Sequence, residues 1–481
     1  MKPLTRSIVA GWVSLGPHFL PFADAASAEL PLSRLLRLAL FQVSVGMALV
    51  LLVGTLNRVM IVELHVPAAL VAVMLALPLM YAPFRALIGH RSDTHRCALG
   101  WRRVPFIWMG TLLQFGGLAI MPFALLVLSG GGAAAQYPGW LGQAGAAAAF
   151  LLVGAGLHTT QTAGLALATD LAPVERQPKV VGLMYVMLLV GTIVSALLFG
   201  WLLAEFSPAR LVQVIQAAAV ATLVVNSVAL WKQERIVLGG APRPVRPDPT
   251  FSEAWQHYRQ SRRALLRLAA IGLGTLAFSM QDVLLEPYGG HVLGMSVGQT
   301  TWLTAALASG GLFGFGVASA VLSRGFDPAR MAGVGAWVGL PAFGAVILAS
   351  ALHSVPLFVL GALLIGVGGG LFGHGTLTMT MSHATRERTG LALGVWGAVQ
   401  ATAAGLGMAS GGLLRDAFGA IAESGRLGAG LAQPATGYAF VYAVEIVLLI
   451  GTIIVMRQLT SEGARSHVPQ LPAMAARLGG E

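Results

Sequence analysis

Charge is scarce in this sequence, and its scarcity excludes a soluble domain. Charged residues make up 10% of the 481 residues, whereas soluble globular domains carry about 25%. Hydrophobic residues reach 56%, and apolar runs recur at roughly the 20-residue length that crosses a bilayer as a helix. The alternating pattern of a membrane barrel is missing. The sequence therefore predicts an all-α integral membrane protein with several spans.

Cysteine and catalytic motifs are nearly absent as well. The single cysteine, Cys97, excludes a disulfide within the chain. Zinc-site spacings, a Walker loop, a dinucleotide fingerprint, a catalytic triad and paired catalytic carboxylates are not found. We therefore expect no enzyme activity and no dedicated metal site. The net charge of +11 lies mainly in loops, so we interpret it as a membrane-insertion signal rather than a nucleic-acid surface.

The apolar runs predict about twelve transmembrane helices in two halves. They fall roughly at residues 38–62, 67–89, 104–129, 141–169, 180–204, 209–231, 265–287, 298–323, 330–352, 355–381, 391–414 and 437–457. The predicted organisation is a cytoplasmic N-terminal segment at 1–37 with an interfacial helix, a first half at 38–231, a cytoplasmic linker at 232–264, a second half at 265–458 and a cytoplasmic tail at 459–481.

The basic residues predict the orientation. If both termini are cytoplasmic, all of the 30 lysines and arginines except Arg58, Arg210, Arg415 and Arg426 lie on the cytoplasmic side. Such an asymmetry is typical of the positive-inside rule. We therefore expect an N-in, C-in topology, with the lipid bilayer as the immediate surroundings.

The two halves are predicted to be repeats of one unit. An offset of 212 residues aligns the adjacent pair Glu175-Arg176 with Glu387-Arg388, which makes the fourth and fifth helices counterparts of the tenth and eleventh. Six spans, a linker and six more spans is the layout of the major facilitator superfamily, so we expect a bundle of two pseudo-symmetric halves of that type.

The loop from Ile88 to Arg103 supports this fold class. Gly89 and Asp93 stand at a G-x-x-x-D spacing and are followed by Arg102 and Arg103, which resembles the loop signature of major facilitators between spans two and three. In that superfamily the charges lock one conformation. Extra residues separate Asp93 from Arg102 here, so we expect a cytoplasmic loop lock in altered form.

Charges inside predicted spans form a second candidate site. A charge at a helix centre costs about 2.5 to 3.5 kcal/mol on insertion scales. Arg58 and Glu63 lie at the outer end of span one, and Asp282 and Glu286 lie at the outer end of the repeat-related span seven. We expect Arg58 to pair with Asp282 or Glu286 and so close the outer side. Plain snorkelling toward the lipid head groups is the alternative.

Histidines and glycines form a third candidate site. His158 and His374 lie within the fourth and tenth spans, with Gln161 one turn after His158. A neutral imidazole there could bind a metal or relay protons, or could simply bond a neighbouring carbonyl. Small-residue spacings such as Gly366 to Gly370 permit either close helix packing or a flat ring laid against the backbone.

Several segments together resemble the PucC/LhaA family of purple bacteria over roughly residues 15 to 460. They include LFQVSVGMALVLLVGTLNRVMIVEL, ATDLAPVERQPKVVGLMYVMLLVG and SMQDVLLEPYGG. The resemblance implies a factor that assembles light-harvesting antenna complexes in the bacterial inner (intracytoplasmic photosynthetic) membrane. The implied cofactor is bacteriochlorophyll a or a late precursor, and His158 or His374 would be the axial ligand of its magnesium.

The same resemblance implies partners, namely the light-harvesting α and β polypeptides, bacteriochlorophyll synthase and the membrane insertion machinery. Two alternatives stay open at this point. One is a proton-coupled secondary transporter of a small solute, with Glu63, Asp282 or Glu286 as the titrating carboxylate. The other is a membrane scaffold that binds antenna subunits without pigment.

Overall fold

The computed structural model describes residues 30–80, 88, 91, 92, 97, 101–129, 136, 138–173, 176–234, 262–382 and 389–466. These residues form helices and connecting turns, and no strand occurs among them. The predicted interfacial helix and most of the predicted linker lie outside the described residues. Gly89 and Asp93 also lie outside them.

Among the described residues, twelve helical units make up the two halves. The first half consists of α2 (Leu32–Leu49), which continues as η2 (Val50–Leu56) and η3 (Val59–Glu63), then α3 (Ala68–Met80), α5 (Val104–Leu128), α6 (Gly139–Leu171), α7 (Gln177–Leu202) and α8 (Pro208–Leu230). The second half consists of α10 (Arg262–Ser279), which continues as η6 (Met280–Val283) and α11 (Leu285–His291), then α12 (Val297–Leu322), α13 (Pro328–Ala351), α14 (Val355–Ser382), α15 (Thr389–Glu423) and α16 (Ala435–Ser466).

Ten of these helices are long and apolar enough to cross a membrane, and α3 is a shorter apolar helix. The predicted all-α bundle is confirmed. Its ends differ from the hydropathy bounds, since α2 begins at Leu32 and α16 continues to Ser466. Hydropathy underestimates such ends because a helix keeps its backbone hydrogen bonds where its side chains become polar. At the start of α2, Arg34 donates to the backbone oxygen of Gln233 at 2.7 Å.

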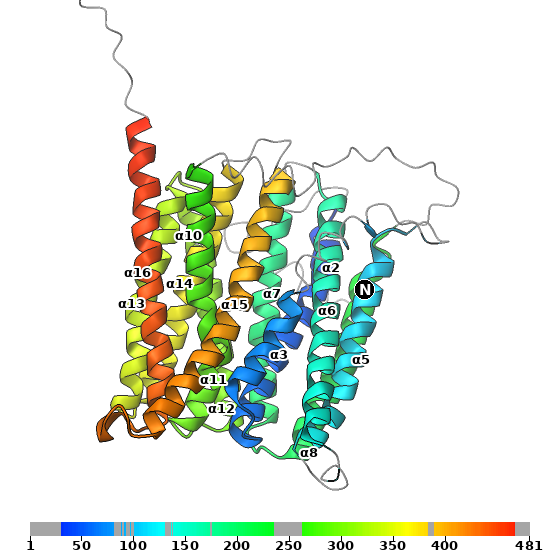
Figure 1. Cartoon of the computed structure of the whole chain (residues 1–481). Helices are drawn as coiled ribbons and strands as arrows, with labels where there is room; N and C mark the ends of the chain where they lie inside the picture. Colours follow the sequence, from blue (N-terminus) through cyan, green and yellow to red (C-terminus); the bar gives the residue numbers. More distant parts are fainter. Residues whose placement is uncertain are drawn as a thin grey trace, which may run out of the picture.

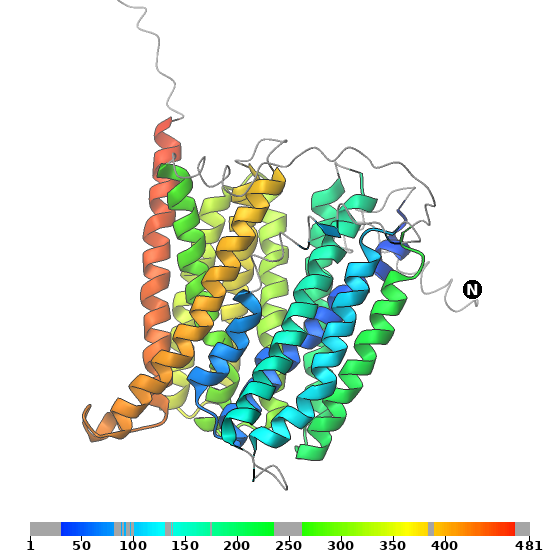
Figure 2. The ribbon, with the colours of Figure 1, turned by 45° about the vertical axis from the view of Figure 1, so that its right-hand side comes forward.

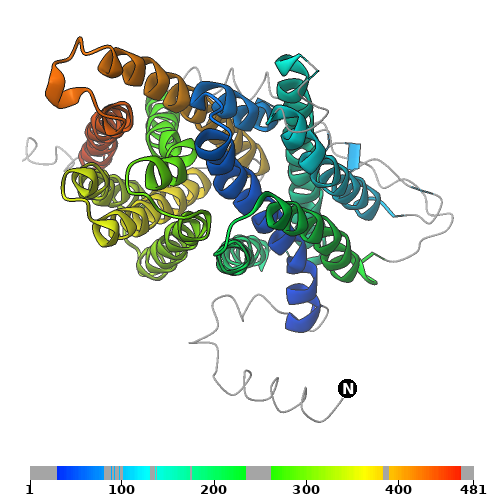
Figure 3. The ribbon, with the colours of Figure 1, turned by 90° about the horizontal axis from the view of Figure 1, so that it is seen from below.

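The helix neighbours repeat between the halves. In the first half α5 packs along α6, and α2 packs on α7 and α8; in the second half α13 packs along α14, and α10 packs on α15 and α16. The most extensive contacts between the halves are those of α3 with α15 and of α7 with α12. The end-on view shows the two groups of helices side by side (Figure 3), and the turned view shows α3 lying along α15 (Figure 2). This arrangement has the pseudo-twofold symmetry that the sequence repeat predicts.

We name the two ends of the bundle by their residues. The basic end holds the start of α2, Arg102, Arg103 and the last turns of α16, at the top of Figure 1. The opposite end holds the starts of α3, α8 and α12.

Glycine spacing mainly serves helix packing. A Cβ added to Gly370 of α14 would lie 2.9 Å from the backbone nitrogen of Phe315 in α12. The Gly366 to Gly370 face therefore lets two backbones approach, which is the packing alternative of the sequence analysis. By contrast, a Cβ at Gly369 or Gly373 of α14 would meet nothing within 4 Å.

Candidate functional site

The first and seventh helices both lose regular α geometry toward the opposite end of the bundle. The first helix turns into the π-helical segments η2 and η3, and the seventh is interrupted by the 3-10 turn η6. Each irregular stretch lies at or next to a charged candidate residue, Arg58 in the first helix and Asp282 in the seventh. Such π and 3-10 interruptions often occur at functional sites because they leave backbone groups available for side-chain contacts.

Polar contacts join these interrupted helices across the two halves. The side-chain amide of Asn57 donates to the backbone oxygen of Val283 at 2.9 Å. Thr55 and Thr301 share a hydrogen bond between their hydroxyl oxygens at 3.2 Å. Asn57, Thr55 and Thr301 are all fully buried, so these bonds form in an apolar setting where an unmade bond would be costly.

Arg58 is buried, but its ion pair is not the expected one. Its guanidinium donates to Glu63 on the same helix and, at 3.2 Å, to the backbone oxygen of Met295 in the other half. The described contacts thus give Arg58 a direct ion pair with Glu63 and not with Asp282 or Glu286, although Arg58 and Glu286 are close enough to interact electrostatically. The π register explains the difference, because it brings residues five apart onto one face of the helix, and Glu63 is five residues after Arg58.

Glu286 lies against the first helix. Its carboxylate accepts a hydrogen bond from Thr304 of α12. The carboxyl carbon lies 3.2 Å from the position that a Cβ on Gly54 would occupy. Glu286 is 3% exposed, and its second oxygen has no hydrogen-bond partner. The missing side chain of Gly54 thus makes the space for this buried carboxyl group.

Asp282 and Glu445 form a second acidic group farther into the second half. The side-chain amide of Gln281 donates to Asp282. Glu445 of α16 is fully buried, interacts electrostatically with Asp282 and has no hydrogen-bond partner on either oxygen. The sequence analysis missed Glu445. The signal was present, because Glu445 is a carboxylate within the predicted span 437–457, and the cost of a charge inside a span applies to it equally.

The two histidines do not meet at one site. His158 of α6 is buried one turn after Gly154, where an added Cβ would meet Pro78 of α3. Gln161 is half-buried on the next turn. His374 of α14 packs edge-on against Phe315 of α12, with 4.2 Å between the ring centroids. His374 thus contacts the second helix of its own half, α12, and in the other half Gly154, one turn before His158, lies against the second helix, α3.

A pigment places two demands on such a site, a ring nitrogen and room for a flat macrocycle. The Nδ1 atom of His374 is buried and makes no hydrogen bond, and Gly369 and Gly373 leave open space on the same helix. These features fit a single axial ligand. Among the described residues, no group of three or more His, Cys, Asp or Glu side chains is arranged to hold a metal ion.

Arg102 and Arg103, at the end of the Ile88 to Arg103 loop, bond to elements of the first half. The Nε atom of Arg103 donates to Asp170 at the end of α6, at 3.0 Å, and its Nη1 donates to Ser92 at 2.6 Å. Arg102 approaches Asp170 at 3.4 Å. The carboxylate of Glu234 accepts from the backbone nitrogens of residues 102 to 104 and so caps α5. The loop therefore stabilises the basic end of one half.

The halves contact each other at the opposite end through bonds to the main chain. Asp416 of α15 accepts from the backbone nitrogen of Ala69 at the start of α3, at 2.7 Å. The indole of Trp302 in α12 donates to the backbone oxygen of Leu197 in α7 at 3.1 Å. Together with the bond from Arg58 to Met295, these hydrogen bonds to backbone groups join the halves at the opposite end.

Sequence comparison identifies the family. The profile described as "PUCC protein" matches residues 55–464. The chain is 63% identical over 419 residues to "Protein PucC" of Rhodovulum sulfidophilum, covering 87% of this chain and 92% of that one. It is 57% identical over 444 residues to "Protein PucC" of Cereibacter sphaeroides, covering 92% and 95%. The chain belongs to the PucC family.

Structural comparison confirms the fold of this PucC-family protein. A bacterial homolog of the human lysosomal transporter Spinster, solved in an inward-facing and unoccupied conformation, superposes with a TM-score of 0.67 at 16% identity, covering 90% of this chain and 97% of that one. At that identity the match supports the major-facilitator fold alone. The chain is thus a multi-pass membrane protein of a family related to photosynthetic complexes.

Proposed function

We propose that the protein is an assembly factor for light-harvesting antenna complexes, and that it binds bacteriochlorophyll and delivers it to inserting α and β polypeptides. The observation that carries this proposal is the PucC-family match over nearly the whole chain. The membrane would be the bacterial inner, intracytoplasmic photosynthetic membrane. Bacteriochlorophyll synthase and the insertion machinery would be further partners, since they supply the pigment and the polypeptides.

His374 is the residue we assign to pigment binding, with His158 as the second candidate. When bound, bacteriochlorophyll supplies a magnesium ion that takes one axial ligand. A neutral imidazole is a suitable ligand, and the Nδ1 atom of His374 is a buried polar atom that lacks a partner. Phe315 holds the His374 ring from one side, and Gly373 leaves the neighbouring backbone accessible. In this proposal α14 therefore binds and orients the pigment.

The test is co-purification of the tagged, full-length protein from photosynthetic membranes, recording the absorption spectrum and the bound polypeptides. We expect retained bacteriochlorophyll in the unchanged protein and at least a several-fold loss in His374→Ala. The control is His353→Asn, because His353 is exposed and has a positive φ of 46°, which asparagine tolerates. A pigment-free protein that still restores antenna assembly in a deletion strain would favour the pigment-free scaffold instead.

A proton-coupled transporter is the second candidate, and the buried carboxyl groups favour it. Glu286 and Glu445 are both buried with unpartnered oxygens, and intramembrane carboxylates commonly mark proton pathways. Uptake of a solute into proteoliposomes that collapses when the proton gradient is dissipated would support transport. Antenna loss in a deletion strain that no supplied solute reverses would count against it.

A further inference from the structure

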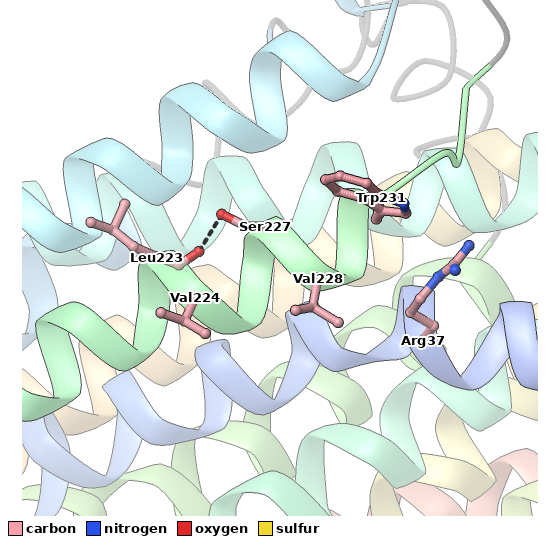
Figure 4. A pocket seen from close by; sticks show the side chains of 6 residues that line it. All are labelled: Arg37, Leu223, Val224, Ser227, Val228 and Trp231. Carbon is pink, nitrogen blue, oxygen red and sulfur yellow. Dashed lines mark hydrogen bonds between the residues drawn. The ribbon is translucent and has the colours of Figure 1, made fainter. Parts of the chain in front are cut away.

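A groove opens between α2 and α8 near the basic end, away from every candidate residue above. Its cavity volume is about 550 Å³, and it is lined by Arg37, Leu223, Val224, Ser227, Val228 and Trp231. Figure 4 shows Arg37 rising from α2 toward the end of α8 that carries Trp231, with Val224 and Val228 projecting from α8 along the groove. The volume is in the range of ordinary small-molecule sites, roughly 300 to 1,000 Å³.

The walls of this groove are held in place by hydrogen bonds between the two helices. Toward the bundle centre, the hydroxyl of Ser44 in α2 donates to Asn226 of α8 at 2.8 Å, and both residues are fully buried. At the basic end, the guanidinium of Arg34 donates to the side-chain and backbone oxygens of Gln233 at 3.2 and 2.7 Å. The groove is therefore preformed rather than opened by a ligand.

Its chemistry changes along its length. Val224 and Val228 are 57% and 45% exposed, and Trp231 at the rim is 63% exposed. Tryptophan is enriched where hydrocarbon meets the head-group layer. The Ser227 hydroxyl already donates to the backbone oxygen of Leu223 at 2.6 Å, so its hydrogen is not available to a ligand. The lining is thus apolar on the bundle side and interfacial at the rim.

Arg37 is the only charged side chain among the described residues that line the groove. Its Nε atom is buried and has no hydrogen-bond partner in the described part of the chain, whereas the neighbouring Arg34 is bonded to Gln233. A guanidinium without an acceptor at a membrane interface is favourably placed for an anionic head group. Among the described residues that line the groove, none is a carboxylate that could offset the charge of Arg37.

The length of the groove selects among amphiphilic occupants. Residues 223 to 231 span about 12 Å along a helix axis, whereas a transmembrane polypeptide crosses a hydrocarbon core of about 30 Å. The groove is therefore too short for a transmembrane polypeptide, and its length suits part of a molecule that lies within one leaflet of the bilayer. We propose that it is a binding site for an anionic phospholipid, with the head-group phosphate on Arg37 beside Trp231 and an acyl chain along Val228 and Val224.

The test is native mass spectrometry of the full-length protein in mild detergent, titrated with phosphatidylglycerol and with phosphatidylcholine. We expect tighter binding of phosphatidylglycerol, and a loss of at least about tenfold in Arg37→Gln, as for a lost charge-assisted contact. Arg37→Lys should retain most of the affinity because it keeps the positive charge. Val228→Trp should weaken binding by filling the groove while leaving the charge unchanged.

A matched control lies at the other interface. Arg210 also lines a cavity near a tryptophan, Trp201, but that cavity is smaller, at about 240 Å³, and contains the acidic Glu205. Arg210→Gln should leave phosphatidylglycerol binding unchanged. Equal affinity for the two lipids, or equal loss in Arg37→Gln and Arg210→Gln, would overturn the proposal. Displacement of a bound pigment or antenna polypeptide by Val228→Trp, with lipid binding unchanged, would assign the groove to that occupant instead.

Discussion

At Gly54 the backbone of the first helix leaves space for the carboxyl group of Glu286. A Cβ there would lie 3.0 Å from the Thr304 hydroxyl oxygen and 3.2 Å from the Glu286 carboxyl carbon. Glycine at position 54 therefore allows Glu286 and Thr304 of the second half to pack against the first helix.

We predict that Gly54→Ala destabilises the protein by about 1 to 3 kcal/mol, as overpacking of a tight contact does. Thermal unfolding of the purified protein measures this. Gly116→Ala is the control, since a Cβ on Gly116 of α5 would meet nothing within 4 Å. That control should unfold at the same temperature as the unchanged protein or slightly above it, because alanine favours helix. Equal unfolding temperatures for both variants would contradict the role of Gly54.

Glu445 presents the opposite situation, a buried carboxyl group without a hydrogen-bond partner. Such a group costs free energy wherever it is unsatisfied. We predict that Glu445→Leu keeps or raises the unfolding temperature, whereas Glu286→Leu lowers it, because Thr304 would lose its acceptor. If the protein needs Glu445 for function, antenna assembly should fall in Glu445→Leu despite unimpaired stability. A lower unfolding temperature in Glu445→Leu would show instead that Glu445 is structurally satisfied.

At the scale of helices, the spans follow directly from hydropathy, but the interruptions in the first and seventh helices do not. The polar pairs Asn57-Arg58 and Gln281-Asp282 indicate where these helices are interrupted. The π or 3-10 register, however, depends on contacts with other helices, such as Asn57 with Val283. Repeat symmetry alone therefore suggested a direct ion pair between Arg58 and the second half, whereas the local register pairs Arg58 directly with Glu63.

The start of α3 depends on a residue from the other half. Asp416 caps this helix at Ala69, and loss of an N-cap costs roughly 1 kcal/mol. We predict that Asp416→Ala increases hydrogen exchange in the first turn of α3, as the opposite end loosens. Asp327 caps α13 within its own half, accepting from the backbone nitrogen of Arg330 at 2.7 Å. Asp327→Ala should therefore increase hydrogen exchange in α13 alone. If hydrogen exchange in α3 stays unchanged in Asp416→Ala, the contact between Asp416 and Ala69 does not hold the halves together.

At the scale of the whole molecule, the sequence repeat predicts the paired halves because each half buries equivalent helix faces. Which end closes is not encoded in the repeat. It follows from single residues without repeat counterparts in that role, such as Trp302 on Leu197 and Asp416 on Ala69. The candidate site follows the same division. Its helices were predictable, and Glu445 could have been found as a carboxylate within a predicted span, whereas the position of His374 beside Phe315 depends on packing between helices.

The orientation of the bundle in the membrane is a prediction from charge alone. In an N-in, C-in topology the basic end is cytoplasmic and the opposite end faces outward. With Cys97→Ser as the background, Glu205→Cys places a thiol at the opposite end, and Arg324→Cys places one at the basic end; both positions are exposed. An impermeant maleimide applied to intact cells with a permeable outer membrane should label Glu205→Cys at once and Arg324→Cys only after the inner membrane is opened. The reverse pattern would invert the topology and move the groove at Arg37 to the outer leaflet, where the positive-inside argument does not apply.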